Sequence, residues 1–101
     1  MYRSILIQPE DFSLDRALTD LKARSGLAGG LCFFTGAVRN SNLDDAVGGL
    51  YLEHYPGMTE RSILESIQSA ARRWPVQAVQ VVHGVGELTA GEPIVWLAVG
   101  S

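Results

Sequence analysis

Cysteine and lysine are nearly absent from this 101-residue chain, which has one of each, Cys32 and Lys22. A single cysteine excludes an internal disulfide bond and a cysteine-rich metal site. An unpaired thiol fits a reducing compartment, so we expect the protein to be cytoplasmic. No metal and no cofactor is expected.

Long hydrophobic runs are also missing. No stretch approaches the ~18 consecutive apolar residues that a membrane-spanning helix needs. The opening residues, MYRSILIQPEDF, contain no apolar run long enough for a signal peptide. We therefore expect no membrane association.

Positive charge is in short supply as well. Eight Lys and Arg residues stand against eleven Asp and Glu residues, giving a net charge of -3 and a pI of about 5.2. A general nucleic-acid-binding face needs clustered basic residues, so we expect no nucleic-acid partner. The hydrophobic share of 47% is typical of a globular chain, and the length suits one domain spanning residues 1–101.

Hydrophobic periodicity predicts the element order β-α-β-β-α-β-β. This order predicts the α+β class, a two-layer sandwich with both helices on one face of a mostly antiparallel sheet. The second strand is apolar on both faces, so we expect it to be central. The predicted strands are 2–8, 29–39, 47–55, 76–86 and 94–101, the helices lie within 11–26 and 58–74, and the main loop and turn are 40–46 and 87–93.

Capping residues set the expected helix starts. Ser13 is a good N-cap for the first helix. For the second helix, Ser62 and Glu65 match a capping box, while Thr59 offers an earlier start. Pro75 cannot continue that helix, so we expect it to end there.

Few residues suggest catalysis by themselves. Cys32 lies inside a predicted strand, and a buried structural thiol is the favoured interpretation. His54 and His83 have no flanking metal-ligand pattern, so a hydrogen-bonded structural role is favoured for each. No spacing ties together any two of the candidate acids, Glu53, Glu87 and Glu92.

Arg39 stands where an apolar strand meets a polar loop. Residues on loops at strand ends often bind ligands, and arginine suits bidentate contact with phosphate or carboxylate. Composition alone nevertheless favours a solvated strand end.

Four stretches together resemble one family. FTGAVRN, LEHYPGMTE, RRWPV and HGVGELTAGE occur in the order and spacing of the catalytic (large) subunit of molybdopterin synthase, the MoaE-like family. The resemblance covers residues 5 to 101. It implies an α/β hammerhead fold and a sulfurtransferase in molybdenum cofactor biosynthesis, which converts a cyclic pyranopterin phosphate into the dithiolene of molybdopterin. It also implies a small ubiquitin-like sulfur carrier with a C-terminal Gly-Gly thiocarboxylate, bound to a homodimer of large subunits in a heterotetramer.

The resemblance implies roles for four residues. Arg39 matches the family's anion-binding arginine, Ala37 and Val38 are its neighbours in the substrate-binding turn, and Phe34 matches a pocket-lining aromatic. Because the attacking sulfur belongs to the partner, the large subunit needs cations and hydrogen-bond donors rather than a thiol.

Two departures from the family lead to further expectations. His83-Gly84 stands where the family has His-Arg, and the chain stops at Ser101, before the family's His-Arg pair and two active-site lysines. Lys22 cannot replace either lysine, so we expect no catalytic residue within the chain, no activity from the chain alone, and exposed apolar surface near Trp96.

Three interpretations remain open. The chain is the N-terminal two-thirds of a synthase large subunit, a truncated non-catalytic member that acts as a dimerisation or partner-binding module, or an unrelated α+β ligand-binding domain.

Overall fold

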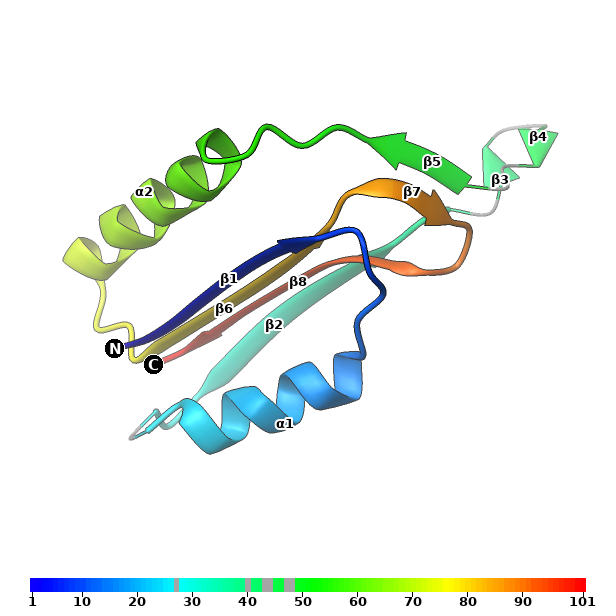
Figure 1. The fold of residues 1–101 in the computed structure, drawn as a ribbon. Coiled ribbons are helices and arrows are strands. Elements are labelled where there is room, and N and C mark those ends of the chain that lie inside the picture. Colours follow the sequence, from blue (N-terminus) through cyan, green and yellow to red (C-terminus); the bar gives the residue numbers. More distant parts are fainter. Residues whose placement is uncertain (27, 40, 43–44, 47–48) are drawn as a thin grey trace.

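The computed structural model describes residues 1–26, 28–39, 41–42, 45–46 and 49–101. Figure 1 shows how the elements are arranged. In chain order they are β1 (Tyr2–Gln8), α1 (Leu14–Arg24), β2 (Leu31–Ala37), β3 (Ser41–Asn42), β4 (Asp45–Ala46), β5 (Gly49–Leu52), α2 (Met58–Arg73), β6 (Ala78–Gly84), β7 (Gly86–Thr89) and β8 (Pro93–Gly100).

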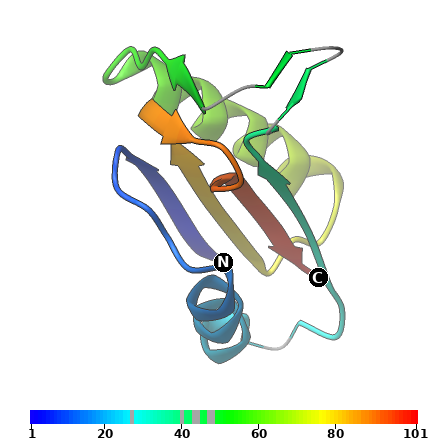
Figure 2. The same ribbon diagram turned by 90° about the vertical axis from the view of Figure 1, so that its right-hand side faces the viewer.

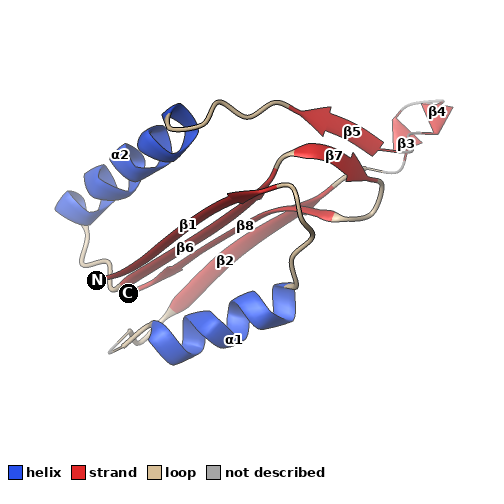
Figure 3. Ribbon diagram, in the orientation of Figure 1, coloured by secondary structure: helices blue, strands red, loops and turns tan. Residues whose placement is uncertain are grey.

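The main sheet has four strands in the order β1-β6-β8-β2. β1 pairs with β6 in parallel, whereas β8 is antiparallel to both β6 and β2. Two small antiparallel ladders, β3-β4 and β5-β7, extend from one end of this sheet (Figure 3). The predicted α+β class with mostly antiparallel pairing is therefore confirmed.

The two helices cover opposite faces of the main sheet, as Figure 2 shows. Alternate residues of β6 belong to different cores: Ala78 and Val82 pack with α1, whereas Val79 and Val81 pack with Ile67 of α2. Successive side chains of a strand point to opposite faces, so the two cores are separated by the sheet. The expectation that both helices share one face is wrong, because the order of elements does not specify the face to which each connection crosses.

The core under α1 contains the most deeply buried large side chains of the described residues. Leu21 is 0% exposed and Trp96 is 1% exposed. Burying a side chain such as Leu21 contributes roughly 1.5–3 kcal/mol. The apolar side chains of α1 therefore face the sheet; they are Leu14, Ala17, Leu18 and Leu21. Ser13 caps the helix, as predicted, by accepting from the N–H of Arg16.

β2 is an edge strand of the main sheet, contrary to the prediction that it is central. It pairs with β8, and its other side pairs with no strand in the part of the chain that the structure describes. Phe33 and Phe34 point to opposite faces and are 49% and 62% exposed. The apolar residues of a strand indicate what its two faces contact. Whether the strand is central depends instead on how many other strands pair with its edges.

Apolar exposure near Trp96 comes from its neighbours and not from Trp96 itself. The ring of Phe33 stacks on the buried Trp96 with 4.8 Å between centroids, and Leu97 on the other face is 42% exposed. The expected exposed surface therefore exists along β2 and β8.

Two further boundaries differ from those predicted. β5 ends at Leu52 rather than at residue 55, and β7 occupies residues that were predicted as a turn. Both differences have one cause: β5 and β7 pair with each other. Gly49 lies opposite Thr89, and Leu52 lies opposite Gly86. This contact joins residues that are far apart in the sequence, so local patterns do not reveal it. Of the predicted loop 40–46, residues 40, 43 and 44 lie outside the described residues.

Candidate functional site

Backbone hydrogen bonds fix the end of β2, where Arg39 follows. The N–H of Val38 donates to the carbonyl of Glu92, and the N–H of Gly91 donates to the carbonyl of Val38, both over 2.9 Å. The turn between β7 and β8 therefore holds Val38, whose side chain is 2% exposed. Arg39 is exposed next to this anchored residue.

A register shift lies just before this point. The pairing of β2 with β8 is regular up to Gly36–Val95, and then Ala37 pairs with Pro93. Such an irregularity bends a strand and re-aims the side chains after it. Ala37 is exposed, as is Arg39. This bulge, between Gly36 and Ala37, therefore separates the regular part of β2 from the segment that leads to Arg39.

The four residues proposed from the sequence form one continuous surface segment only in part. Ala37, Val38 and Arg39 are consecutive, and Val38 contributes its backbone because its side chain is buried. Phe34 lies before the bulge, within the regular part of β2, and its ring is exposed. Arg39 thus offers an exposed cation after the end of an edge strand, and Phe34 offers an exposed aromatic ring within that strand; a guanidinium suits contact with an anion.

Cys32 is exposed, and this corrects the expectation of a buried thiol. It lies on the outer strand β2, opposite Val99 of β8. The expectation depended on how often free cysteines are buried. Here the edge strand has open faces, which leave the thiol accessible.

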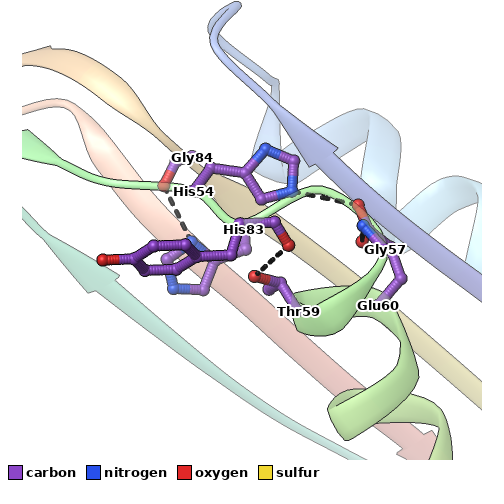
Figure 4. Close-up of polar contacts among 7 residues, drawn as sticks. His54, Gly57, Thr59, Glu60, His83 and Gly84 are labelled. Carbon is purple, nitrogen blue, oxygen red and sulfur yellow. Dashed lines mark hydrogen bonds and ion pairs between the residues drawn. The ribbon is translucent and has the colours of Figure 1, made fainter.

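A second polar cluster connects β5 to α2 (Figure 4). One carboxylate oxygen of Glu60 lies 3.0 Å from Nε2 of His54, and the other accepts from the N–H of Gly57 over 2.7 Å. Gly57, with φ at +86°, is the N-cap of α2. A glycine has no side chain with which to cap the helix, so Glu60, three residues later, satisfies the donor instead.

This arrangement replaces both predicted starts of the second helix. The helix begins at Met58, before Ser62 and Glu65, and Thr59 lies inside it. The hydroxyl of Thr59 donates to the carbonyl of Tyr55 over 3.3 Å. The same carbonyl also accepts from the N–H groups of Met58 and Thr59. The sequence signal for the true start of this helix is Gly57 followed three residues later by Glu60.

Hydrogen bonds lower the pKa of Glu60 below its ordinary value. The backbone N–H of Glu60 itself has the largest effect, desolvation opposes it, and the N–H of Gly57 and the imidazole of His54 add to the lowering. The carboxylate is thus held in its charged form, the form that caps the helix.

Both histidines have hydrogen-bond partners, as predicted. His54 contacts Glu60, and Nδ1 of His83 lies 2.7 Å from the carbonyl oxygen of Gly84. A carbonyl only accepts, so Nδ1 of His83 is the protonated ring nitrogen.

The candidate acids do not converge. Glu53 accepts from the hydroxyl of Tyr55 over 2.7 Å, Glu87 lies on β7, and Glu92 lies in the turn that anchors Val38. Within the described ranges, no three His, Cys, Asp or Glu side chains are placed to hold a metal ion. No helix among these residues is long and apolar enough to cross a membrane.

Comparison with known proteins identifies the family. A family model described as MoaE protein matches residues 7–101. The molybdopterin synthase catalytic subunit of Vibrio cholerae is 46% identical over 101 residues, which are 100% of this chain and 67% of the relative. The corresponding subunit of Escherichia coli is 44% identical over 97 residues, 96% of this chain and 64% of the relative.

Solved structures agree with the sequence comparison. The molybdopterin biosynthesis MoaE protein of Burkholderia ambifaria has a TM-score of 0.83 and 39% identity, covering 100% of this chain and 65% of its own. The chain therefore spans about two thirds of the length of the relatives that it matches. On its sequence and its fold, the chain belongs to the MoaE family.

Proposed function

We propose that the protein acts in molybdenum cofactor biosynthesis as the catalytic subunit of a molybdopterin synthase. In this reaction, two sulfur atoms are transferred to a cyclic pyranopterin phosphate to form the dithiolene of molybdopterin. The donor is the thiocarboxylate on the C-terminal Gly-Gly of a small ubiquitin-like partner. The match to the MoaE family over residues 7–101 is the observation that carries this proposal.

In this proposal, Arg39 binds a negative group, either the phosphate of the pterin or the carboxylate of the partner's tail. Its exposure beside the anchored Val38 supports this role, because a fixed backbone reduces the freedom lost when an anion binds. Phe34 supplies an exposed aromatic face, and Ala37 leaves room beside the guanidinium. The attacking sulfur comes from the partner, so the exposed Cys32 has no part in the chemistry.

The proposal includes a homodimer of this subunit within a heterotetramer. Exposed apolar side chains on both faces of the β2–β8 pair support a protein interface there, because exposed hydrophobic side chains that gather at one place often mark interaction sites. The side chains are Leu31, Phe33, Phe34 and Leu97. A cytoplasmic location is also proposed, because a reducing compartment preserves an exposed unpaired thiol.

A second candidate function is a non-catalytic module that keeps the dimer and partner surfaces. The position of Lys22 favours it. Lys22 lies in the last turn of α1, near the start of β2, whereas Arg39 follows the other end of that strand. Seven strand residues span about 23 Å, so Lys22 does not reach a substrate held by Arg39.

One experiment separates the two functions. The 101-residue chain is mixed with the thiocarboxylated small partner and the pterin phosphate precursor, and the dithiolene product is measured beside calorimetric binding of each component. Product formation supports the catalytic function, and binding without product supports the module. If neither the precursor nor the partner binds, both proposals are wrong.

A further inference from the structure

The turn between β7 and β8 lies beside the end of β2, where Arg39 follows (Figure 1). The N–H of Glu92 donates to the carbonyl of Thr89 over 3.1 Å, which closes a four-residue β-turn. Gly91, the third residue of this turn, has φ at +87°. A positive φ at the third position is typical of a type II turn, where glycine is the usual residue. The turn therefore depends on the one residue type that has no Cβ.

Val38 lies opposite two residues of this turn rather than one. Its N–H donates to the carbonyl of Glu92, and its carbonyl accepts from the N–H of Gly91, both over 2.9 Å. Two residues opposite one, the first of them a glycine at positive φ, form the pattern of a G1 β-bulge. Gly91 thus serves the turn and the bulge at once, and its conformation determines where both bonds to Val38 are made.

Another bulge comes one residue earlier along β2. The pairing with β8 shifts between Gly36 and Ala37, which leaves Ile94 of β8 without a register partner on β2. Bulges bend a strand, increase its twist and re-aim the side chains that follow. Two bulges in succession, at Ala37 and at Val38, therefore determine the direction in which the chain leaves the sheet.

Arg39 is the next residue along the chain, and its Cα lies about 3.8 Å from that of Val38. The turn holds the backbone of Val38, and burial holds its side chain, of which 2% is exposed. The exposed side chain of Arg39 is thereby attached to a backbone with little freedom. Ordering the backbone of one residue changes an equilibrium constant about 5- to 30-fold. A backbone that is already ordered favours binding by a similar factor.

We propose that Gly91 is a positioning residue for the anion contact of Arg39. Its role rests on the proposed function, in which Arg39 binds the phosphate of the pterin or the carboxylate of the partner's tail. Gly91 acts through its turn and through the two bonds to Val38, which require a positive φ. A side chain that resists this φ opens the bulge and releases the end of β2. The anion must then order Arg39 as it binds, and its affinity falls.

Gly91→Val and Gly91→Asn form a matched pair of variants. A Cβ at position 91 would meet no atom of the described residues within 4 Å, apart from those of its chain neighbours, so both side chains have room. Valine is β-branched and rarely adopts a positive φ, whereas asparagine adopts it more readily. Gly26→Val is the control for strain. Gly26 has φ at +64° and an equally open position, but it follows α1.

Hydrogen exchange of the Val38 N–H, followed by NMR, measures the bulge without any ligand. Gly91→Val should speed this exchange about 5- to 30-fold, the range for a residue forced into the left-handed region. Gly91→Asn should speed it less, and Gly26→Val should leave it near the native rate, under conditions in which circular dichroism shows every variant folded. If Gly91→Val does not fold, Gly91→Ala replaces it. Equal exchange in the two valine variants, or in the valine and asparagine variants at position 91, would overturn the proposal.

Calorimetric binding of the pterin phosphate precursor tests the link to Arg39. Gly91→Val should weaken binding about 5- to 30-fold in the native background, and it should have no further effect in Arg39→Ala, because the two residues act as one unit. Equal weakening in both backgrounds would show that Gly91 does not act through Arg39. If the native chain does not bind the precursor, the proposed function is wrong and so is the binding role of Gly91. The exchange of the Val38 N–H would still decide whether Gly91 holds the end of β2.

Discussion

The carboxylate of Glu60 joins His54 to the start of α2, with 3.0 Å between Oε1 and Nε2. Its second oxygen accepts from the N–H of Gly57, the N-cap residue of the helix. One side chain therefore fastens both the incoming loop and the first turn. The direction of α2 relative to β5 depends on this contact and on the carbonyl of Tyr55, which accepts three hydrogen bonds from the first turn.

Replacing Glu60 with alanine should lower the melting temperature. The change leaves the N–H of Gly57 without its acceptor and His54 without its partner. Thermal unfolding followed by circular dichroism measures the effect. Glu65→Ala is the control, since Glu65 lies exposed on the same helix and the change in helix propensity is the same. Equal melting temperatures for the two variants would show that the Glu60 contacts do not stabilise the protein.

Acid should remove the contribution of Glu60. The pKa of this carboxyl is lower in the folded state than its ordinary value of 4.5. The unfolded state therefore binds the proton more readily, and the stabilisation is complete above the unfolded pKa and is lost as pH falls through the folded pKa. Urea unfolding of the native chain and of Glu60→Gln should differ at pH 7, and the difference should shrink below pH 4.5. A difference that stays constant with pH would contradict this assignment.

Arg39→Ala should weaken binding of the pterin phosphate by about 1.5–3 kcal/mol, the scale of a charge-assisted hydrogen bond. Calorimetric titration of the precursor into both forms measures the loss. Arg72→Ala, in the last turn of α2, removes the same charge far along the chain and should leave the affinity unchanged. Equal affinities for the native and Arg39→Ala forms would place the anion elsewhere.

Cys32→Ser should change the free energy of unfolding by less than ~0.5 kcal/mol, because the side chain is exposed. A buried thiol would have cost roughly twice as much through lost packing. At a concentration low enough to keep the folded chain monomeric, iodoacetamide should alkylate Cys32 at a rate close to that in urea, as mass spectrometry can follow. Strong protection of the thiol in the folded state would show that this face of β2 is covered in solution.

Gly84→Ala should destabilise the protein by about 1 kcal/mol. A Cβ at this position would lie 3.2 Å from Cδ2 of Leu88 and 3.4 Å from the carbonyl oxygen of Ile94. Chemical unfolding measures the loss, and Leu88→Val in the same chain should recover part of it by removing the close contact. Purely additive effects of the two changes would mean that Leu88 is not the obstacle. In this chain, the same crowding would oppose an arginine at position 84, the residue that the family resemblance implies there.

Local patterns determined most helices and strands. The apolar stripe of the first helix, its cap at Ser13 and the stop before Pro75 depend on neighbours within a few residues, so the sequence alone predicts them. The placement of Arg39 at a strand end was predictable for the same reason. The motifs around it were enough to indicate the family, which the comparisons confirm.

The sequence did not determine which side of the sheet each helix covers, or that β2 lies at an edge. These depend on which distant strands pair, and such contacts leave no local periodicity. The exposure of Cys32 follows from that edge position. The Glu60 contacts and the hydrogen bond from the Trp96 indole to the Gln80 side chain likewise arise only when the segment before α2 meets its first turn and β6 meets β8, because each needs two segments that the fold brings within hydrogen-bond distance.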